Sequence, residues 1–182
     1  MTNPPTTTPP FRLLLDTNAV LELHRRDAWS ALLQRRSIVV PSIVAHEESF
    51  YYERASQTII IDLPSLIAKG EIQELEATPS EMRTVASEFD RVFVEGLHSG
   101  ELEAVAILKK NPDDPLRFCT SDKVAIYALV LLNLEEHLVS LEALLREVGL
   151  GRPLSPEFME SYLQRHREIG AVKRITGDGL RK

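Results

Sequence analysis

The chain has 182 residues, of which 43% are hydrophobic and 26% charged, and its formal net charge is -6 at pH 7. This composition is that of one globular domain, and the acidic balance argues against a broad basic surface for nucleic acid. No apolar run approaches the roughly 20 residues of a membrane span, and the first residues lack the basic end and apolar core of a secretory signal. We therefore expect a cytoplasmic protein without membrane contact. The single cysteine, Cys119, excludes an internal disulfide framework, and we expect it in the core.

The first half of the chain predicts strands that alternate with helices. Short apolar runs are typical of buried strands, whereas spaced apolar residues after cap-type polar residues indicate helices. Residues 1–10, which are rich in proline and threonine, predict a flexible leader. The elements expected after them are a strand at 11–15, a helix from 19 to about 34, a strand at 37–40, a helix from about 44 that carries VAHEESFYYERAS, and short extended pieces at 57–78 with a turn at 69–70.

The second half continues this alternation up to a domain boundary near residue 150. Strands separated by helices predict parallel pairing with crossover helices, and hence an α/β sandwich with a central parallel sheet. We expect one domain at 11–150, followed by a C-terminal helix and basic tail at 151–182. The expected elements are helices at 78–95 and 99–110, a strand through Thr120, a helix after Asp122, a strand at 137–140, a helix closed by Gly149, and a last helix that begins at Ser155.

Two aspartates follow predicted strands at the edge of the sheet where ligands bind. Asp16 ends the first strand and Asp122 follows the strand through Thr120, and each precedes a helix. The carboxyl ends of parallel strands face one crevice, so both side chains are predicted to lie there. Helix N-capping is the alternative for each, because aspartate is favoured at that position.

Two glutamates on predicted helices are further candidates. Glu47 falls about one turn into the second helix, where a solvated helix face is the alternative. Glu101 shares a helical stripe with apolar residues, and an acid on such a stripe is costly unless it is paired or bound to a cation. A first-turn acid favoured by the helix dipole is the competing role for Glu101. Glu103 points elsewhere and is expected to be solvated.

Carboxylates that converge without matching lysines or arginines repel one another, and hard divalent cations relieve this repulsion through oxygen coordination. The pattern thus predicts a site for Mg²⁺ or Mn²⁺. Two such ions can activate a water and stabilise the leaving oxygen in phosphodiester hydrolysis, which is nuclease chemistry. The histidines show no tight ligand spacing, and we expect them in surface or local structural roles; they are His24, His46, His98, His137 and His166.

Four short motifs resemble those of the PIN-domain family. In chain order they are LLLDTN at 13–18, VVPSIVAHE at 39–47, SGELEAVAIL at 99–108 and FCTSDKVA at 118–125. Each motif alone is weak, but all four occur in order on the predicted elements, over roughly residues 11–149. The resemblance implies a three-layer α/β/α fold and an endoribonuclease that depends on Mg²⁺ or Mn²⁺.

The resemblance also implies roles for individual residues. Asp16, Glu47, Glu101 and Asp122 are the implied metal ligands, with Asp16 and Asp122 holding the principal ion and the glutamates positioning the attacking water. Asn18 and Thr120 are polar residues that orient the acids or their waters. Many members of the family are toxins held inactive by an antitoxin protein and are often dimeric. The additional length at 57–78 and after 151 favours, as an alternative, a solitary nuclease that acts on RNA.

Two rival functions remain open. A haloacid-dehalogenase-type phosphatase also opens with an apolar strand that ends in aspartate, but it has a second acid where this chain has Asn18. A non-catalytic PIN-like module that binds RNA or a protein has no physical need for four unpaired carboxylates. For RNA phosphates, the candidate contacts in the basic tail lack interleaved aromatic residues for base stacking; they are Arg165, Arg167, Lys173 and Arg174.

Overall fold

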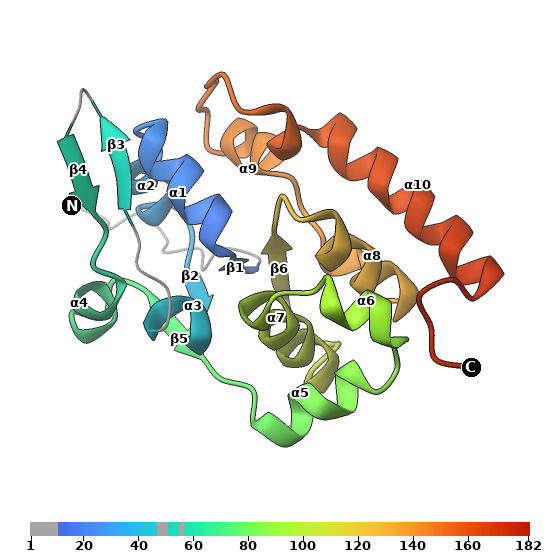
Figure 1. Ribbon diagram of the computed structural model, residues 1–182. Helices are drawn as coiled ribbons and strands as arrows, with labels where there is room; N and C mark the ends of the chain where they lie inside the picture. Colours follow the sequence, from blue (N-terminus) through green and yellow to red (C-terminus); the bar gives the residue numbers. More distant parts are fainter. Residues whose placement is uncertain (1–10, 47–50, 55–56) are drawn as a thin grey trace.

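A four-stranded parallel sheet forms the centre of the molecule (Figure 1). The computed structural model describes residues 11–46, 51–54 and 57–182. The sheet has the strand order β5-β2-β1-β6, and its neighbouring strands are all parallel. The predicted α/β class with a central parallel sheet is therefore confirmed. The strands are β1 (Arg12–Leu15), β2 (Ile38–Pro41), β5 (Gln73–Leu75) and β6 (Leu116–Cys119).

Helices cover both faces of this sheet, which makes three layers. Side chains alternate along a strand, so Leu13 and Leu15 of β1 join one buried cluster and Leu14 joins another. The helices that contribute buried residues to the first cluster are α1 (Thr17–Arg25), α2 (Trp29–Leu33), α3 (Ser42–His46), α4 (Leu63–Ala68) and α9 (Leu141–Glu147). Those that contribute to the second are α5 (Pro79–Ala86), α7 (Ser99–Lys110), α8 (Lys123–Leu131) and α10 (Glu160–Thr176).

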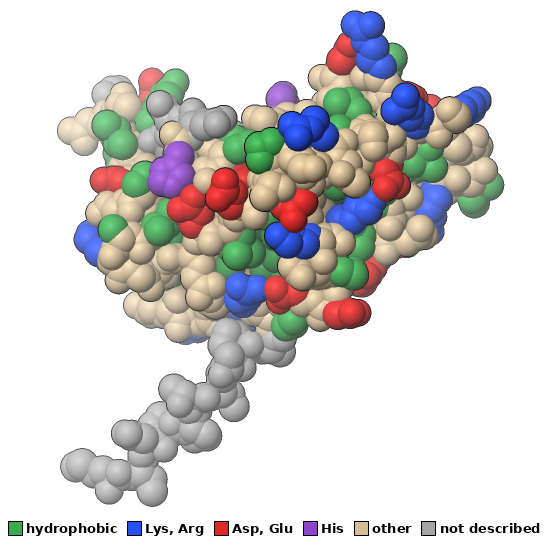
Figure 2. Space-filling model, turned by 90° about the horizontal axis from the view of Figure 1, so that it is seen from below, with side chains coloured by type: hydrophobic (Ala, Val, Ile, Leu, Met, Phe, Trp, Pro, Cys, Tyr) green, Lys and Arg blue, Asp and Glu red, His purple; other side chains and the backbone are tan. Residues whose placement is uncertain are grey.

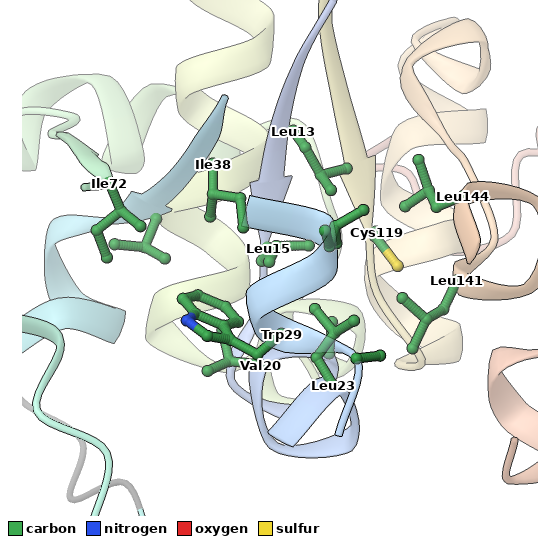
Figure 3. Packing of buried hydrophobic residues seen from close by; sticks show 14 of the residues in the cluster. Leu13, Leu15, Val20, Leu23, Trp29, Ile38, Ile72, Cys119, Leu141 and Leu144 are labelled. Atoms are coloured by element: carbon green, nitrogen blue, oxygen red, sulfur yellow. The ribbon is translucent and has the colours of Figure 1, made fainter. Parts of the chain in front are cut away.

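The first cluster packs β1 and β6 against α1 and α9. Figure 3 shows Leu13 and Leu15 in the middle of this cluster, with Leu141 and Leu144 of α9 near the sulfur of Cys119. Cys119 is fully buried and free, as expected for a core residue. Burial of the short strands on both faces explains their continuous apolar sequence.

Two helices that were predicted to be continuous are broken. The helix expected at 19–34 ends at Arg25, because Asp27 adopts a left-handed conformation with φ 53°, and Trp29 begins α2. The helix expected at 78–95 divides into α5 and α6 (Arg91–Glu95). Asp90 starts α6 by accepting a hydrogen bond from the N–H of Phe93 at 2.8 Å. In both places an aspartate, a residue favoured at turns and helix caps, interrupts the helix although the apolar spacing continues.

The helix expected to carry VAHEESFYYERAS is wrong at Tyr51–Arg54. Its described part is α3, and Tyr51–Arg54 form strand β3, which pairs antiparallel with β4 (Gln57–Ile60). Aromatic and β-branched residues, among them the cross-strand pair Tyr52 and Ile59, favour a strand over a helix. The extended piece and turn expected after it are present as β5 and as Gly70, with φ 72°, but α4 lies between β4 and that turn.

The strand predicted at 137–140 is also wrong. The chain there forms the 3₁₀-helix η1 (Glu135–His137) and a single isolated bridge from Leu138 to Phe118 of β6. A second 3₁₀-helix, η2 (Pro156–Phe158), precedes α10, so the last predicted helix begins later than expected. Among the described residues, no helix is long and apolar enough to span a membrane.

Helix α10 lies along α8 (Figure 1) and joins the C-terminal segment to the domain. The two helices approach closely at Gly170, where an added Cβ would lie 2.9 Å from Cβ of Val130. Arg174 strengthens the contact by donating to the carbonyl of Val130 and to the side chains of Asn133 and Glu135 at 2.8 to 2.9 Å.

Replacement of Gly170 by alanine is predicted to destabilise the protein. The added methyl group has no space against Val130, so α10 must shift, and overpacking of this kind costs about 1–3 kcal/mol. Gly151→Ala is the matched control, because no atom lies within 4 Å of the position that its new methyl group would take. Urea unfolding of both variants measures the effect, and an unchanged free energy of unfolding for Gly170→Ala would contradict the close packing.

Candidate functional site

Asp16 directly follows β1 and is the N-cap of α1. The residue is 4% exposed. Its Oδ1 accepts a hydrogen bond from the N–H of Ala19 at 2.7 Å, and its Oδ2 accepts one from the hydroxyl of Thr120 at 2.6 Å. The first bond is the helix cap, and the second joins the ends of two adjacent strands. The carboxylate is therefore fixed in position from both sides.

Asp122 lies two residues beyond Thr120 and is the N-cap of α8. Its Oδ1 accepts hydrogen bonds from the N–H groups of Val124 at 2.6 Å and Ala125 at 3.0 Å. Its own N–H donates to the hydroxyl oxygen of Thr120 at 3.0 Å. Thr120 therefore connects the two aspartates, and the capping role considered for each of them is real.

Glu101 belongs to the first turn of α7 and is 7% exposed. Its Oε2 accepts a hydrogen bond from the N–H of His98 at 3.1 Å, and Nδ1 of His98 lies 3.5 Å from the same oxygen. One side-chain ligand atom each of His98, Glu101 and Asp122 lies within 4.8 Å of the others. The structure thus brings together an acid that follows β6 and an acid at the start of α7, with a histidine at their margin.

A pocket of about 410 Å³ opens beside this cluster. Asp16, Asn18, His98 and Glu101 are among the residues that line it. Asn18 is exposed at the pocket. Glu47, the remaining predicted ligand, lies outside the described residues. Of the six predicted site residues, the structure therefore groups Asp16, Glu101, Asp122 and Thr120 and sets Asn18 at the rim.

Glu103, expected to be solvated, is instead 1% exposed. Its carboxylate accepts hydrogen bonds from the N–H of Ile43 at 2.7 Å and from the N–H of Ala77 at 3.2 Å. These bonds connect α7 to the segments that follow β2 and β5. The expectation failed because the apolar spacing within one helix carries no information about backbone N–H groups in distant segments. Here such groups follow the ends of neighbouring strands and donate to Glu103. Glu103 thus helps to hold α7, and with it Glu101, against the sheet.

The buried acids of the cluster resist ionisation. Burial raises the pKa of Asp16 to about 6, against the opposing effect of its hydrogen bonds. Burial, and after it the charge of Asp122, raises the pKa of Glu101 to about 7. In the described part of the chain, neither a lysine nor an arginine forms an ion pair with Asp16, Glu101 or Asp122, and His98 is the basic neighbour of Glu101. If all three carboxylates were ionised, no lysine or arginine among the described residues would pair with their negative charge.

A divalent cation fits this set of donors. Mg²⁺ and Mn²⁺ prefer carboxylate oxygens, and a cation would favour the ionised forms that burial and mutual repulsion disfavour. The described acids that would hold it are Glu101 and Asp122, which have ligand atoms within 4.8 Å of each other, and Asp16, which lines the same pocket as Glu101. His98 adds a nitrogen donor, which Mn²⁺ accepts more readily than Mg²⁺. Sequence reasoning missed His98, although its position three residues before Glu101, at the start of a helix, is a signal for proximity.

On one face of the molecule, the surface charge agrees with a local site and not with a general affinity for polyanions. Figure 2 shows acidic and basic side chains interspersed over one face of the molecule, without one large patch of a single sign. Any attraction of a nucleic acid to that face must therefore be local.

Comparison of the chain with models of known protein families and with curated proteins gave no match. The PIN-domain resemblance thus rests on the four sequence motifs, with the α/β fold consistent with it, and it stays a prediction.

The raised pKa values predict that the metal-free protein loses stability as the pH rises. Asp16 has a pKa of 3.8 when solvated and about 6 in the fold. Its contribution to the free energy of unfolding is therefore fully present below about pH 4 and is lost as the pH rises through about 6. Relative to Asp16→Asn, the free energy of unfolding of the wild type should fall by about 1–2 kcal/mol between pH 5 and pH 8.

Urea unfolding in EDTA at the two pH values measures this difference. Asp90→Asn is the control, because it alters a capping carboxylate of α6 that lies outside the pocket. Parallel pH dependence for wild type and Asp16→Asn would contradict the account of a buried carboxylate that resists ionisation.

Proposed function

We propose that the protein is a metal-dependent ribonuclease that hydrolyses phosphodiester bonds at the pocket beside Asp16, Glu101 and Asp122. The observation that carries this proposal is the convergence of the buried carboxylates of Asp16 and Glu101 with the half-buried carboxylate of Asp122 at the carboxyl edge of a parallel sheet. None of the three has a lysine or arginine partner among the described residues. Capping explains the hydrogen bonds of each acid but not why burial and repulsion are tolerated together. When bound, Mg²⁺ or Mn²⁺ supplies charge neutralisation and an activated water for hydrolysis.

The side chains have separate roles in this proposal. Asp16, oriented by the hydroxyl of Thr120, and Asp122, fixed at the start of α8, provide rigid oxygen ligands. Such fixed ligands keep a reacting phosphate and water in one geometry. Glu101, which lines the pocket, is suited to accept a hydrogen bond from the attacking water at its carboxylate oxygens. Asn18, at the pocket rim, is placed to contact the substrate or an ordered water.

RNA is proposed as the substrate on the strength of the PIN-domain resemblance. The same resemblance is the basis for an antitoxin partner and a homodimer, and both stay predictions. The non-catalytic module that binds RNA or protein is the alternative that the experiment below separates from the nuclease.

Cleavage of labelled single-stranded RNA tests the proposal. The wild type should cut RNA with Mn²⁺ or Mg²⁺ and not in EDTA, and Asp16→Asn and Asp122→Asn should each reduce cleavage by at least about 100-fold. This expectation is a lower bound, because loss of a residue that merely supports a metal ligand already costs roughly 10- to 100-fold. Asp90→Asn, a helix-capping control outside the pocket, should keep wild-type activity.

The outcomes separate the candidate functions once circular dichroism has shown that each variant folds. Equal activity in Asp122→Asn and Asp90→Asn would assign the site acids to helix capping and contradict the nuclease. Binding of RNA without metal-dependent cleavage would favour the non-catalytic module.

A further inference from the structure

Three aromatic side chains gather where α8 and α10 meet, next to Asp122. Tyr127 of α8 and Tyr162 of α10 lie on either side of His166, with ring-centroid distances to it of 5.5 Å and 4.3 Å. The Tyr127 hydroxyl and Nδ1 of His166 are 2.7 Å apart and hydrogen-bonded. All three rings are partly exposed. This aromatic cluster, defined as Tyr127, Tyr162 and His166, is a rigid surface built from residues far apart in the sequence.

The aromatic cluster is continuous with the candidate site. Asp122 is the N-cap of α8, the helix that carries Tyr127 in its second turn, and its negative charge also acts on the pKa of Tyr127, Tyr162 and His166. Asp122 is also the residue whose side chain meets Glu101. A strand of RNA with a phosphate at the acids would therefore reach these rings with its neighbouring nucleotides.

Two exposed cations border the aromatic cluster. Lys123 lies four residues before Tyr127 on α8, and Arg165 lies three residues after Tyr162 on α10, so each cation is a neighbour of one ring on its own helix. Two further basic residues of the tail have structural partners. Arg174 binds the end of α8, and Lys173, whose Nζ lies 5.7 Å from the centroid of the Tyr127 ring, pairs with Asp178. Arg165 and Lys123 are thus the cations placed to meet phosphates beside the acidic pocket.

We propose that the aromatic cluster, with Lys123 and Arg165, is the surface on which single-stranded RNA binds beside the catalytic pocket, with an unpaired base stacked on Tyr162 and flanking phosphates at the two cations. This inference rests on the proposed function. Base stacking on aromatic side chains and local positive charge are the general means by which proteins hold single strands. Paired bases in a duplex cannot stack in this way, so the surface selects unpaired RNA. The expectation that the basic tail lacks aromatic residues for stacking is revised, because Tyr162 lies one helical turn before Arg165 and Tyr127 joins it from α8.

Binding of a fluorescein-labelled single-stranded RNA in EDTA tests the proposal separately from catalysis. Without a cation the acidic pocket repels phosphate, so attraction must come from another surface. Tyr162→Leu keeps an apolar side chain toward the core but removes the ring, and it should weaken binding about 10-fold, whereas Tyr162→Phe should bind like the wild type. Arg165→Gln should weaken binding about 3- to 10-fold at low salt. It should also reduce the slope of log K against log salt concentration by about 1, which corresponds to one released counterion.

Arg167→Gln is the matched control for charge, since it lies on the same helix and its charge acts on Glu160 instead of on the aromatic cluster. Duplex RNA of the same sequence should bind more weakly and be indifferent to Tyr162→Leu. Fluorescence anisotropy gives the affinities, and thermal unfolding confirms that the variants fold.

The outcomes distinguish the proposal from the function on which it rests. If the wild type cleaves RNA with metal but binds it in EDTA no better than Tyr162→Leu and Arg165→Gln do, the binding surface is overturned and the nuclease stands. If the wild type neither cleaves nor binds RNA, both are overturned. A folding defect in Tyr162→Leu leaves the exposed Arg165→Gln as the deciding variant.

Discussion

The parallel pairing of β1 with β6 determines where the candidate site forms. Leu15 is opposite Cys119 in this pair, so the next residue on each strand, Asp16 and Thr120, comes to the same edge of the sheet. A 2.6 Å hydrogen bond from the Thr120 hydroxyl to Asp16 connects the two strand ends at that edge. Because the chain then enters α8 at once, Asp122 is delivered to the same place. A shift of one residue in this register would turn Leu14 and Leu15 to the wrong faces and separate the acids.

The three site acids stabilise the starts of helices, but their proximity to one another has an electrostatic cost. As caps, Asp16 and Asp122 satisfy N–H groups at the starts of α1 and α8, and Glu101 does the same before α7. Burial, and after it the charges of Asp122 and Asp16, raises the pKa of Glu101 and disfavours full ionisation of the three acids. The dipoles of the helices that begin at these acids partly offset the cost. The cation that we propose would offset it further.

The sequence was sufficient for three strands of the sheet and for the positions of three of the acids. Continuous apolar strands followed by cap residues predicted β1, β2 and β6, and the stripe on α7 predicted that Glu101 faces inward. These signals are local and periodic, so they can be recognised without knowledge of the fold. The turn at Gly70 was likewise predicted, because glycine adopts a positive φ without strain.

What the sequence did not predict depends on contacts between distant segments. Glu103 is buried because Ile43 and Ala77 present N–H groups to it, and nothing in its own helix signals this. The hairpin β3–β4 required pairing across residues whose spacing also suited a helix. The aromatic cluster arises only when α10 packs on α8, through an approach that Gly170 permits. Local pattern therefore located the acids, while tertiary packing determined the surface around them.

The central claim is that Asp16, Glu101 and Asp122 together hold a divalent cation. The most direct measurement is X-ray diffraction from crystals grown with millimolar MnCl₂, with anomalous data collected to locate manganese. The account predicts an anomalous peak within coordination distance of carboxylate oxygens from at least two of these three residues. Manganese found only at other surface sites, with these carboxylates unliganded in a pocket open to solvent, would contradict it.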